Sequence, residues 1–199
     1  MTILDITRPI EHGMEVYPGD PEVHIEVVAD PTWGDPALVS RLSMGTHAGT
    51  HVDAPRHARP GAMPVDALPL AAMLGPAWVA DGTWAPGDLG ADDLDRLAMP
   101  PGTRRLLMRF GVRTGGPGLR PDAAARLRDG GIVLVGTDGD SIASAHDPMP
   151  THHVLLDAGV VVLEGLDLTA ADTGEWDLLC LPLRLAGGEA APARVVIRR

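Results

Sequence analysis

The chain has 199 residues, of which 45% are hydrophobic and 22% are charged, and its formal net charge is −11. This length and composition are typical of one globular domain, so we expect residues 1–199 to fold as a single unit. The acidic balance disfavours nucleic acid and anionic membrane surfaces as partners, because both need clustered cations. No apolar run is long enough to span a membrane, and the first residues lack the pattern of a signal peptide, so we expect a cytoplasmic protein.

Three residue types are missing from the chain. It contains no lysine, asparagine or glutamine, so all 16 of its basic residues other than histidine are arginine. This excludes Schiff-base catalysis through a lysine, a Walker-type phosphate site and a Cys-His-Asn triad. It also excludes an oxyanion hole built from side-chain amides. If the protein acts on a carbonyl group, charge must be stabilised by a metal, arginine, hydroxyls or backbone amides.

Strand and helix patterns interleave along the chain. Residues 23–27 alternate apolar and polar side chains as a half-buried strand does, whereas 132–135 are continuously apolar, which is typical of a strand buried on both faces. The predicted strands cover 3–7, 23–27, 38–44, 77–80, 105–110, 132–135, 160–163, 178–185 and 193–197. The predicted helices cover 65–74, closed by Gly75-Pro76, then 92–98, 121–129, and 152–157 with Thr151 as N-cap. We therefore expect an α/β domain with a mixed sheet or barrel.

The stretch 47–57 concentrates side chains that bind divalent metals. Neutral imidazole suits zinc and similar ions, and a carboxylate adds the charge that holds the cation. Four such side chains occupy odd positions, which an extended chain sends to one side: His47, His51, Asp53 and His57. A straight strand would spread them over roughly 33 Å, so the segment must curl, with Gly49 and Pro55 as its bends. The alternative is a loop whose imidazoles are only hydrogen-bonded or solvated.

A second group of candidate ligands lies further along the chain. Glu164 directly follows four apolar residues of a predicted buried strand, where a carboxylate is costly unless it is paired or metal-bound. His152 and His153 stand at the start of a predicted helix and are candidate partners for it. The loop 136–141 follows another buried strand, and sites in α/β proteins commonly form at such strand ends.

Four other residues receive a structural interpretation, at least as one alternative. Cys180 lies in an apolar run and is interpreted as core rather than nucleophile. His12 and His24 have no partners nearby in sequence and are interpreted as structural or surface residues. For Tyr17, the only tyrosine, packing of the Pro-Gly-Asp turn and a role in a pocket both stay open.

The histidine segment also carries a family resemblance. The pattern His47-x-Gly49-Thr50-His51-x-Asp53-x-Pro55-x-His57 resembles the hallmark of the metal-dependent cyclase-like hydrolases, which include the bacterial kynurenine formamidases and are similar to isatin hydrolase. The resemblance extends over most of the chain, through 4–9 and 16–20 at the start and 151–153, 163–166, 181–187 and 191–194 in the closing third.

The resemblance implies a two-metal site, a barrel-like sheet flanked by helices, and a homodimer or higher oligomer. His47, His51 and Asp53 would hold one ion, Asp53 would bridge to a second held by His152 and Glu164, and His57 would be the general acid/base. His152 is preferred over His153 because the number of residues between it and Glu164 agrees with the spacing in the family. The ions would be Zn²⁺ or Mn²⁺, and would activate a hydroxide that attacks an amide carbon. The implied reaction is hydrolysis of N-formyl-L-kynurenine to L-kynurenine and formate, a step of tryptophan catabolism.

Two departures keep other functions open. Tyr17 stands where the kynurenine formamidases typically have tryptophan against the substrate ring, and the loop 138–141 reads Asp-Gly-Asp-Ser instead of the usual Asp-Thr-Pro-Ser. A lactam or lactone hydrolase, or a cyclase or dehydratase acting on a small cyclic or polyketide-like substrate, is the alternative on the same scaffold. A non-catalytic protein that stores metal or binds a ligand is the third possibility, and His57 on the face of the ligands counts against it.

Overall fold

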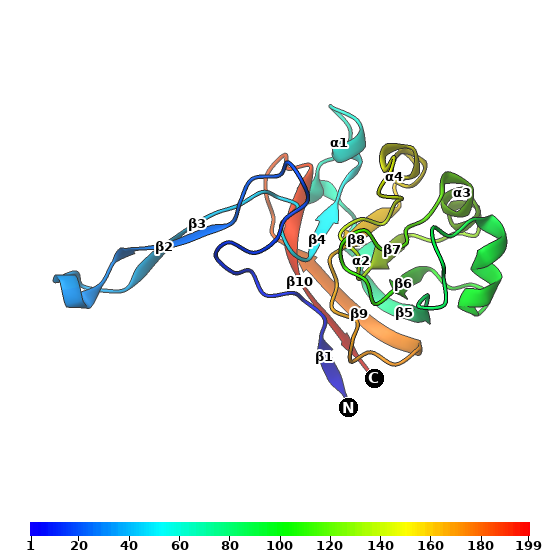
Figure 1. Cartoon of the computed structure of the whole chain (residues 1–199), viewed down its shortest axis with the longest axis horizontal. Coiled ribbons are helices and arrows are strands. Elements are labelled where there is room, and N and C mark those ends of the chain that lie inside the picture. The colour runs from blue at the N-terminus through cyan, green and yellow to red at the C-terminus, as the bar shows by residue number, and fades with distance from the viewer.

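The computed structural model describes all residues, 1–199, and its main feature is a closed mixed sheet (Figure 1). The barrel strands follow one another in the order β10, β4, β8, β7, β6, β5 and β9, and β9 pairs back to β10. Their bounds are β4 (His51–Asp53), β5 (Leu74–Asp81), β6 (Arg105–Arg109), β7 (Leu134–Thr137), β8 (Val161–Glu164), β9 (Gly174–Pro182) and β10 (Ala190–Arg198). The short β1 (Ile3–Asp5) pairs with the outer edge of β10. The predicted α/β fold with a mixed, barrel-like sheet is confirmed.

Helical segments connect the parallel strands of this sheet. The pairs β5–β6, β6–β7 and β7–β8 are parallel, and the other barrel pairs are antiparallel. The three crossovers contain η3 (Ala91–Leu97), α3 (Pro121–Asp129) and α4 (Met149–Leu156), which lie on the outside of the barrel (Figure 1). The shorter elements are η1 (Pro31–Trp33), α1 (Pro55–Ala58), η2 (Val65–Ala67) and α2 (Leu70–Met73). None of the helices has the length and hydrophobicity needed to cross a membrane.

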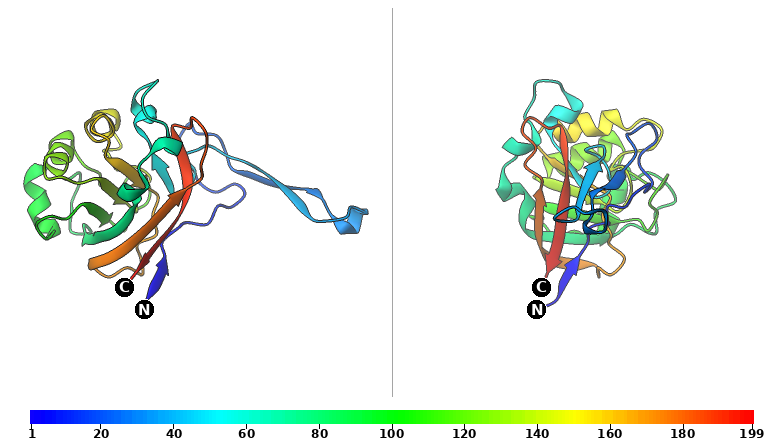
Figure 2. Two further views of the ribbon diagram at one scale, coloured as in Figure 1. Left: turned by 180° about the vertical axis from the view of Figure 1, so that it is seen from behind. Right: turned by 90° about the vertical axis from the view of Figure 1, so that its left-hand side faces the viewer.

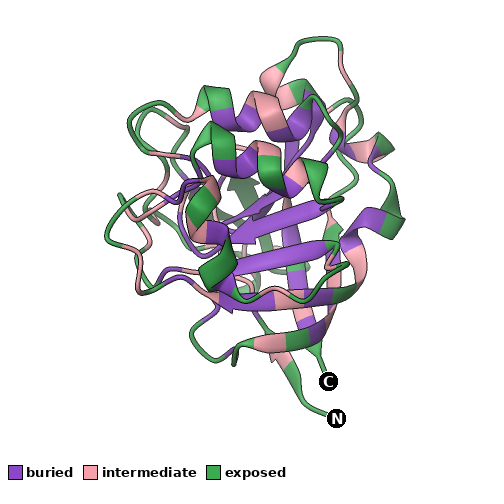
Figure 3. Cartoon of the chain, turned by 90° about the vertical axis from the view of Figure 1, so that its right-hand side faces the viewer, coloured by how far each residue is buried: buried purple, intermediate pink, exposed green.

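Two hydrophobic clusters stabilise the barrel from its two sides. Alternate residues of β7 and β8 face opposite ways, because side chains alternate along a strand. Leu134 and Val161 belong to the cluster that fills the barrel, whereas Val135 and Val162 belong to the cluster under α3 and α4 (Figure 3). The central strands are therefore buried on both faces, as the continuous apolar run 132–135 predicted.

A two-stranded hairpin projects from the barrel. It consists of β2 (His24–Ala29) and β3 (Val39–Ser43), which pair with each other and with no other strand. Figure 1 and the left view of Figure 2 show it extending away from the rest of the chain. All five residues of β3 are exposed. The two strands were predicted, but their separation from the body was not.

Three local predictions differ from the structure. The helix predicted over 65–74 is divided into η2 and α2, because Pro69 favours an extended conformation at Leu68. Gly75-Pro76 does not end a helix but lies inside β5. This part of β5 pairs with β9 and not with β6. Proline lacks the backbone N–H, but no hydrogen bond to β6 is lost at Pro76. Thr151 is not an N-cap: α4 begins two residues earlier, and the buried Thr151 hydroxyl donates to the carbonyl of Leu119 at 2.9 Å.

Candidate functional site

The pairing of β4 with β8 brings the two candidate groups together. In this antiparallel pair His51 lies directly opposite Glu164, and Asp53 lies opposite Val162. Val52 and Leu163 point into the barrel, so the alternation of side chains sends His51, Asp53 and Glu164 to the opposite face. The three polar side chains are buried, with 1–5% of their surface exposed. Two segments separated by more than a hundred residues thus form the floor of one site.

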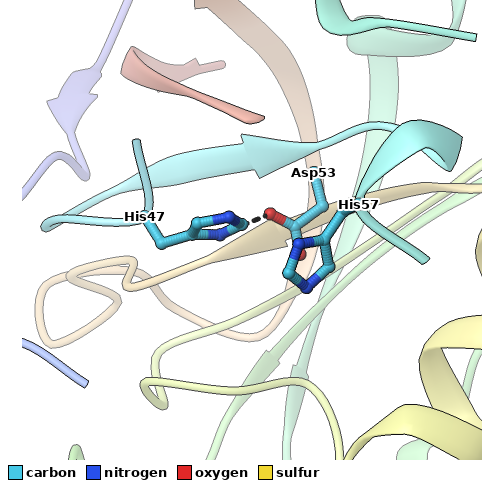
Figure 4. Close-up of side chains that lie close together, drawn as sticks. All are labelled: His47, Asp53 and His57. Carbon is cyan, nitrogen blue, oxygen red and sulfur yellow. Dashed lines mark ion pairs between the residues drawn. The ribbon is translucent and has the colours of Figure 1, made fainter. Parts of the chain in front are cut away.

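Two turns bring the remaining histidines over this floor. Gly49 adopts a positive φ of 68°, and a Cβ there would lie 2.6 Å from Cδ1 of Ile10, so glycine allows the bend that precedes β4. Pro55 is the first residue of α1, which turns His57 back toward Asp53 (Figure 4). From the other side, α4 presents His152, whose Nε2 lies 3.2 Å from Oε1 of Glu164. The predicted curl of 47–57 is therefore confirmed.

Asp53 is central to the cluster. Its Oδ1 lies 3.0 Å from Nδ1 of His47 and 3.4 Å from Nε2 of His51, and its Oδ2 lies 3.7 Å from Nε2 of His152. His47, Asp53 and His57 each offer one ligand atom within 4.8 Å of the others, and so do His51, Asp53 and Glu164. Asp53 belongs to both sets, as a bridging carboxylate would. His57 lies where it could either bind an ion or exchange protons beside one.

Backbone carbonyls orient two of the imidazoles. Nδ1 of His51 donates to the carbonyl of Gly49 at 3.0 Å, and Nδ1 of His152 donates to the carbonyl of Pro148 at 2.9 Å. When Nδ1 carries the proton, the lone pair of a neutral imidazole is on Nε2, which in both residues faces a carboxylate. Lone pairs of nitrogen and oxygen at 3.2–3.3 Å repel each other unless a cation or a proton lies between them. The geometry therefore demands positive charge in the cluster.

The pKa shifts also indicate that the cluster favours positive charge next to its carboxylates. Burial opposes protonation of His51 and His152, but the adjacent carboxylates of Glu164 and Asp53 outweigh it and raise the pKa of each imidazole to about 9. Burial favours the neutral form of Glu164, but the two imidazoles outweigh this and hold its pKa well below the ordinary value. For His57, burial is the main effect and lowers its pKa. The carboxylates stay ionised in a buried site.

A divalent metal fits this donor set. Three polar atoms of the cluster are buried and have no hydrogen-bond partner in the chain: Nε2 of His51 and both carboxylate oxygens of Asp53. Unpartnered buried polar atoms are rare because each costs free energy, and an ion is an ordinary reason for them. Imidazole nitrogen and carboxylate oxygen are the donors of zinc and similar ions.

The cluster opens into a cleft that also contains the predicted substrate residue. The cleft has a volume of about 210 Å³, and Tyr17 lies on its wall, 38% exposed. The loop 136–141 contributes Asp140 and Ser141 to the same wall, as its position after β7 predicted. Next to it, the backbone N–H of Ile142 donates to Oε1 of Glu164 at 2.7 Å. Tyr17 is thus in reach of a molecule bound at the histidines.

Sequence reasoning missed two acidic residues near the site. Glu189 approaches His47, with 3.8 Å between its Oε1 and Nε2 of the imidazole, and accepts a hydrogen bond from Thr46 at 2.5 Å. Asp20 lines the cleft. Glu189 precedes β10, which pairs with β4, and no local pattern indicates that pairing. Asp20 belongs to the Pro-Gly-Asp turn next to Tyr17, and that proximity was the available signal.

The other histidines lie outside the cluster. His153 points to Asp157, with 3.7 Å between Nδ1 and Oδ2, so α4 presents His152 and not His153 to Glu164. His146 is exposed. His12 accepts a hydrogen bond from the N–H of Ile25 at the hairpin, with the ring of His24 close by, which agrees with their structural interpretation.

Comparisons with known proteins place the chain among cyclases and hydrolases. Residues 4–144 match the family model described as "Putative cyclase". The chain is 36% identical to a kynurenine formamidase of Salinibacter ruber, over 100% of this chain and 98% of that protein, and 35% identical to one of Paracidovorax citrulli, over 98% and 95%. The solved structure named "The Structure Of Potential Metal-Dependent Hydrolase With Cyclase Activity" is 32% identical, with a TM-score of 0.83 over 98% of this chain and 96% of the other.

The fold also agrees with a more distant structure. Isatin hydrolase A from Labrenzia aggregata is 24% identical and has a TM-score of 0.82, over 98% of this chain and 93% of the other. The family resemblance seen in 47–57 is confirmed by these matches. Because the family model spans residues 4–144 and relatives above 30% identity align over nearly the whole length, the chain belongs to the cyclase family.

Proposed function

We propose that this protein is a metal-dependent amidohydrolase that cleaves N-formyl-L-kynurenine to L-kynurenine and formate. The observation that carries the proposal is the buried imidazole and carboxylate cluster, with its unpartnered polar atoms, at the floor of a cleft walled by Tyr17. The relatives named kynurenine formamidase, which align with almost the entire chain, support this substrate. The lack of lysine, asparagine and glutamine agrees with metal-assisted chemistry, because other routes to stabilise an amide oxyanion are reduced.

Two divalent ions, Zn²⁺ or Mn²⁺, are part of the proposal. His47, His51 and Asp53 would hold one, and Asp53, His152 and Glu164 the other. Five ligand-type side chains exceed what one four-coordinate site normally uses. Asp53 lies close both to His47 and His57 and to His51 and Glu164, as a shared ligand would. A divalent ion bound there supplies a Lewis acid and brings the pKa of a water molecule near neutrality.

In this proposal the protein's own residues position the amide and move the proton. The aromatic ring of the substrate packs on Tyr17, which places the formyl group over the histidines. Hydrolysis forms a C–O bond to the formyl carbon and breaks its C–N bond, so one proton must leave the water and one must reach the nitrogen. His57 suits both transfers, because burial lowers its pKa and keeps the imidazole neutral at the start.

Hydrolysis of a small cyclic amide is the second candidate. A cleft of about 210 Å³ is small compared with the roughly 300–1,000 Å³ of typical ligand pockets, and a compact bicyclic lactam would fill it. The structural neighbour isatin hydrolase acts, by its name, on such a compound, although its 24% identity supports only the shared fold.

A turnover comparison tests the proposed function. Protein stripped with a chelator is reloaded separately with Zn²⁺ and Mn²⁺, and kcat/KM is measured for N-formylkynurenine, formanilide, isatin and a simple aryl lactone. We expect N-formylkynurenine to be preferred, and His51→Ala to remove the activity while His153→Ala keeps it. Preference for isatin would favour the second candidate, and no turnover of any amide or lactone would contradict the enzyme assignment.

We also propose that the protein works as a homodimer held by the hairpin. An isolated two-stranded hairpin is only marginally stable, so β2–β3 needs a surface to pack on. Its exposed apolar side chains include Trp33, Leu38 and Leu42, which are 54–66% exposed. A groove of about 470 Å³ begins at the base of the hairpin and is lined by Leu42, Leu181 and Leu183. Hairpin and groove are contiguous, so a two-fold axis can place each hairpin on the partner's groove.

Light scattering tests the dimer. Wild-type protein should have the mass of two chains, and Leu38→Ser with Leu42→Ser should shift it toward one chain at low concentration. A wild-type mass of one chain would contradict the proposal.

A cytoplasmic location is also proposed, supported by a single, unpaired cysteine.

A further inference from the structure

A second cavity continues from the cleft of the histidine cluster. It has a volume of about 200 Å³ and shares Tyr17, Asp140 and Ser141 with the cleft. Each cavity alone is smaller than a typical ligand pocket, but the two joined reach the usual size. A substrate held at the histidines and packed on Tyr17 therefore has room to extend past this residue. Among the lining residues that the extension does not share with the cleft are Arg113 and Thr114.

Two guanidinium groups meet one carboxylate at the edge of the extension. Arg8 and Arg113 bind the same oxygen of Asp140, with Nη1 of Arg8 at 2.9 Å and Nε of Arg113 at 3.2 Å, so two guanidinium groups face one carboxylate. The charged residues that line the second cavity are Arg113 and Asp140. Arg113 is therefore the cationic side chain that this cavity offers to a ligand.

Arg113 is both held in place and able to bind. Its Nη2 donates to the carbonyl of Glu15 at 2.8 Å, and its Nε is occupied by Asp140, which fixes the guanidinium plane. Its Nη1 makes no hydrogen bond within the chain, and 37% of the side chain is exposed. The hydroxyl of Thr114 donates to the other oxygen of Asp140 at 2.7 Å, so the carboxylate is held from two sides. A pre-positioned arginine with a free N–H edge is suited to a carboxylate ligand.

We infer that Arg113 binds a carboxylate of the substrate and thereby selects aryl amides whose side chain has a carboxylate over those whose side chain has none. The inference rests on the proposed function, since it assigns the substrate's scissile amide to the histidine cluster and its ring to Tyr17. Asp140 is then a positioning residue that orients Arg113 and, through Arg8, ties the loop after β7 to the N-terminal segment. The α-carboxylate of N-formylkynurenine is an anion of the required kind.

The decisive measurement compares a formamide that has a carboxylate with one that lacks it. N-formylkynurenine carries a carboxylate, and formanilide does not. Arg113→Gln should lower the ratio of kcat/KM for N-formylkynurenine over formanilide by about tenfold or more, mainly through KM, the signature of lost uniform binding. Arg113→Lys should recover part of the ratio because it restores the charge. Arg128→Gln is the matched control, since Arg128 is 38% exposed, pairs with Asp129 and lies on α3 away from both cavities.

A binding measurement separates this inference from the proposed function. Calorimetry with kynurenine and 2-aminoacetophenone, which share the aryl ketone but differ in the amino-acid group, needs no turnover. If kynurenine binds more tightly than 2-aminoacetophenone and Arg113→Gln removes that difference, the carboxylate subsite is supported. This holds even if neither formamide is hydrolysed, because lack of hydrolysis would overturn only the proposed function. If Arg113→Gln lowers binding of both compounds equally, or lowers only the melting temperature, Arg113 is structural and the inference is overturned.

Discussion

Zinc added to chelator-stripped protein should raise its melting temperature by about 8–16 °C. Nε2 of His51 and both carboxylate oxygens of Asp53 are buried without a partner in the chain. Each such atom costs about 1–3 kcal/mol, so an ion that binds all three removes a penalty of several kcal/mol. At a free concentration 1,000 times Kd, binding stabilises the fold by about 4 kcal/mol. In a protein of this size, each kcal/mol shifts the melting temperature by about 2–4 °C.

Differential scanning fluorimetry with metal analysis of the same samples measures this effect. Asp53→Asn keeps the side-chain volume but removes the charge, so the rise in its melting temperature on adding zinc should be much smaller than that of wild type. His153→Ala is the control, because that imidazole faces Asp157 outside the cluster, and it should keep the full response. An unchanged melting temperature in saturating zinc, or well under one ion per chain, would refute the two-ion reasoning.

Three further predictions follow from the site and the core. His57→Ala should keep its metal but lose turnover by about 10²–10⁴-fold, the usual contribution of a general acid/base; simultaneous loss of metal would make His57 a ligand. Tyr17→Leu should raise KM several-fold, because a ring contact contributes about 0.5–1.5 kcal/mol, and Tyr17→Trp should conserve it. An unchanged KM with a lower melting temperature would mean that Tyr17 only packs the turn. Burial raises the pKa of Cys180 to about 12, so a thiol reagent at pH 8 should label it only after unfolding, and rapid labelling of the native protein would contradict its core position.

The candidate ligands could be identified from the sequence because their signal is local. Even spacings between His47, His51, Asp53 and His57 place four donor side chains on one side of an extended chain. A carboxylate directly after a buried apolar run has few stable environments. Their assembly could not be derived in the same way. The contact of His51 with Glu164 depends on the register between β4 and β8, and register is a property of the folded sheet.

Where prediction from sequence failed, tertiary pairing prevailed over local preference. Gly75-Pro76 reads as the end of a helix, but β5 continues through both residues because β9 pairs along its length. The alternation over 23–27 predicts a half-buried strand, yet Ile25 and Val27 are 37% and 44% exposed in the hairpin. The alternation of apolar and polar residues predicts that one face of β2 is covered, but the barrel of the same chain does not cover it.

A glycine next to β8 connects the fold directly to the candidate metal site. Gly159 and Gly165 both have positive φ, 75° and 68°, so alanine at either costs about 1–2 kcal/mol for the left-handed backbone. A Cβ at Gly159 meets nothing within 4 Å, whereas one at Gly165 would lie 2.3 Å from the carbonyl oxygen of Gly49. The carbonyl of Gly49 accepts the hydrogen bond from Nδ1 of His51. A Cβ at residue 165 would therefore press on the backbone that orients the candidate ligand His51.

Gly165→Ala should therefore weaken metal binding as well as stability, and Gly159→Ala should weaken stability alone. We expect Gly159→Ala to lower the free energy of unfolding by about 1–2 kcal/mol with unchanged zinc affinity. Gly165→Ala should lower it further and reduce zinc affinity by about 10–100-fold, the usual effect of disturbing the partner of a ligating imidazole. Urea unfolding of stripped protein and competitive zinc titration measure the two quantities separately. Equal zinc affinity in the two variants would show that relieving the clash at Gly165 does not disturb the orientation of His51, and would contradict the prediction.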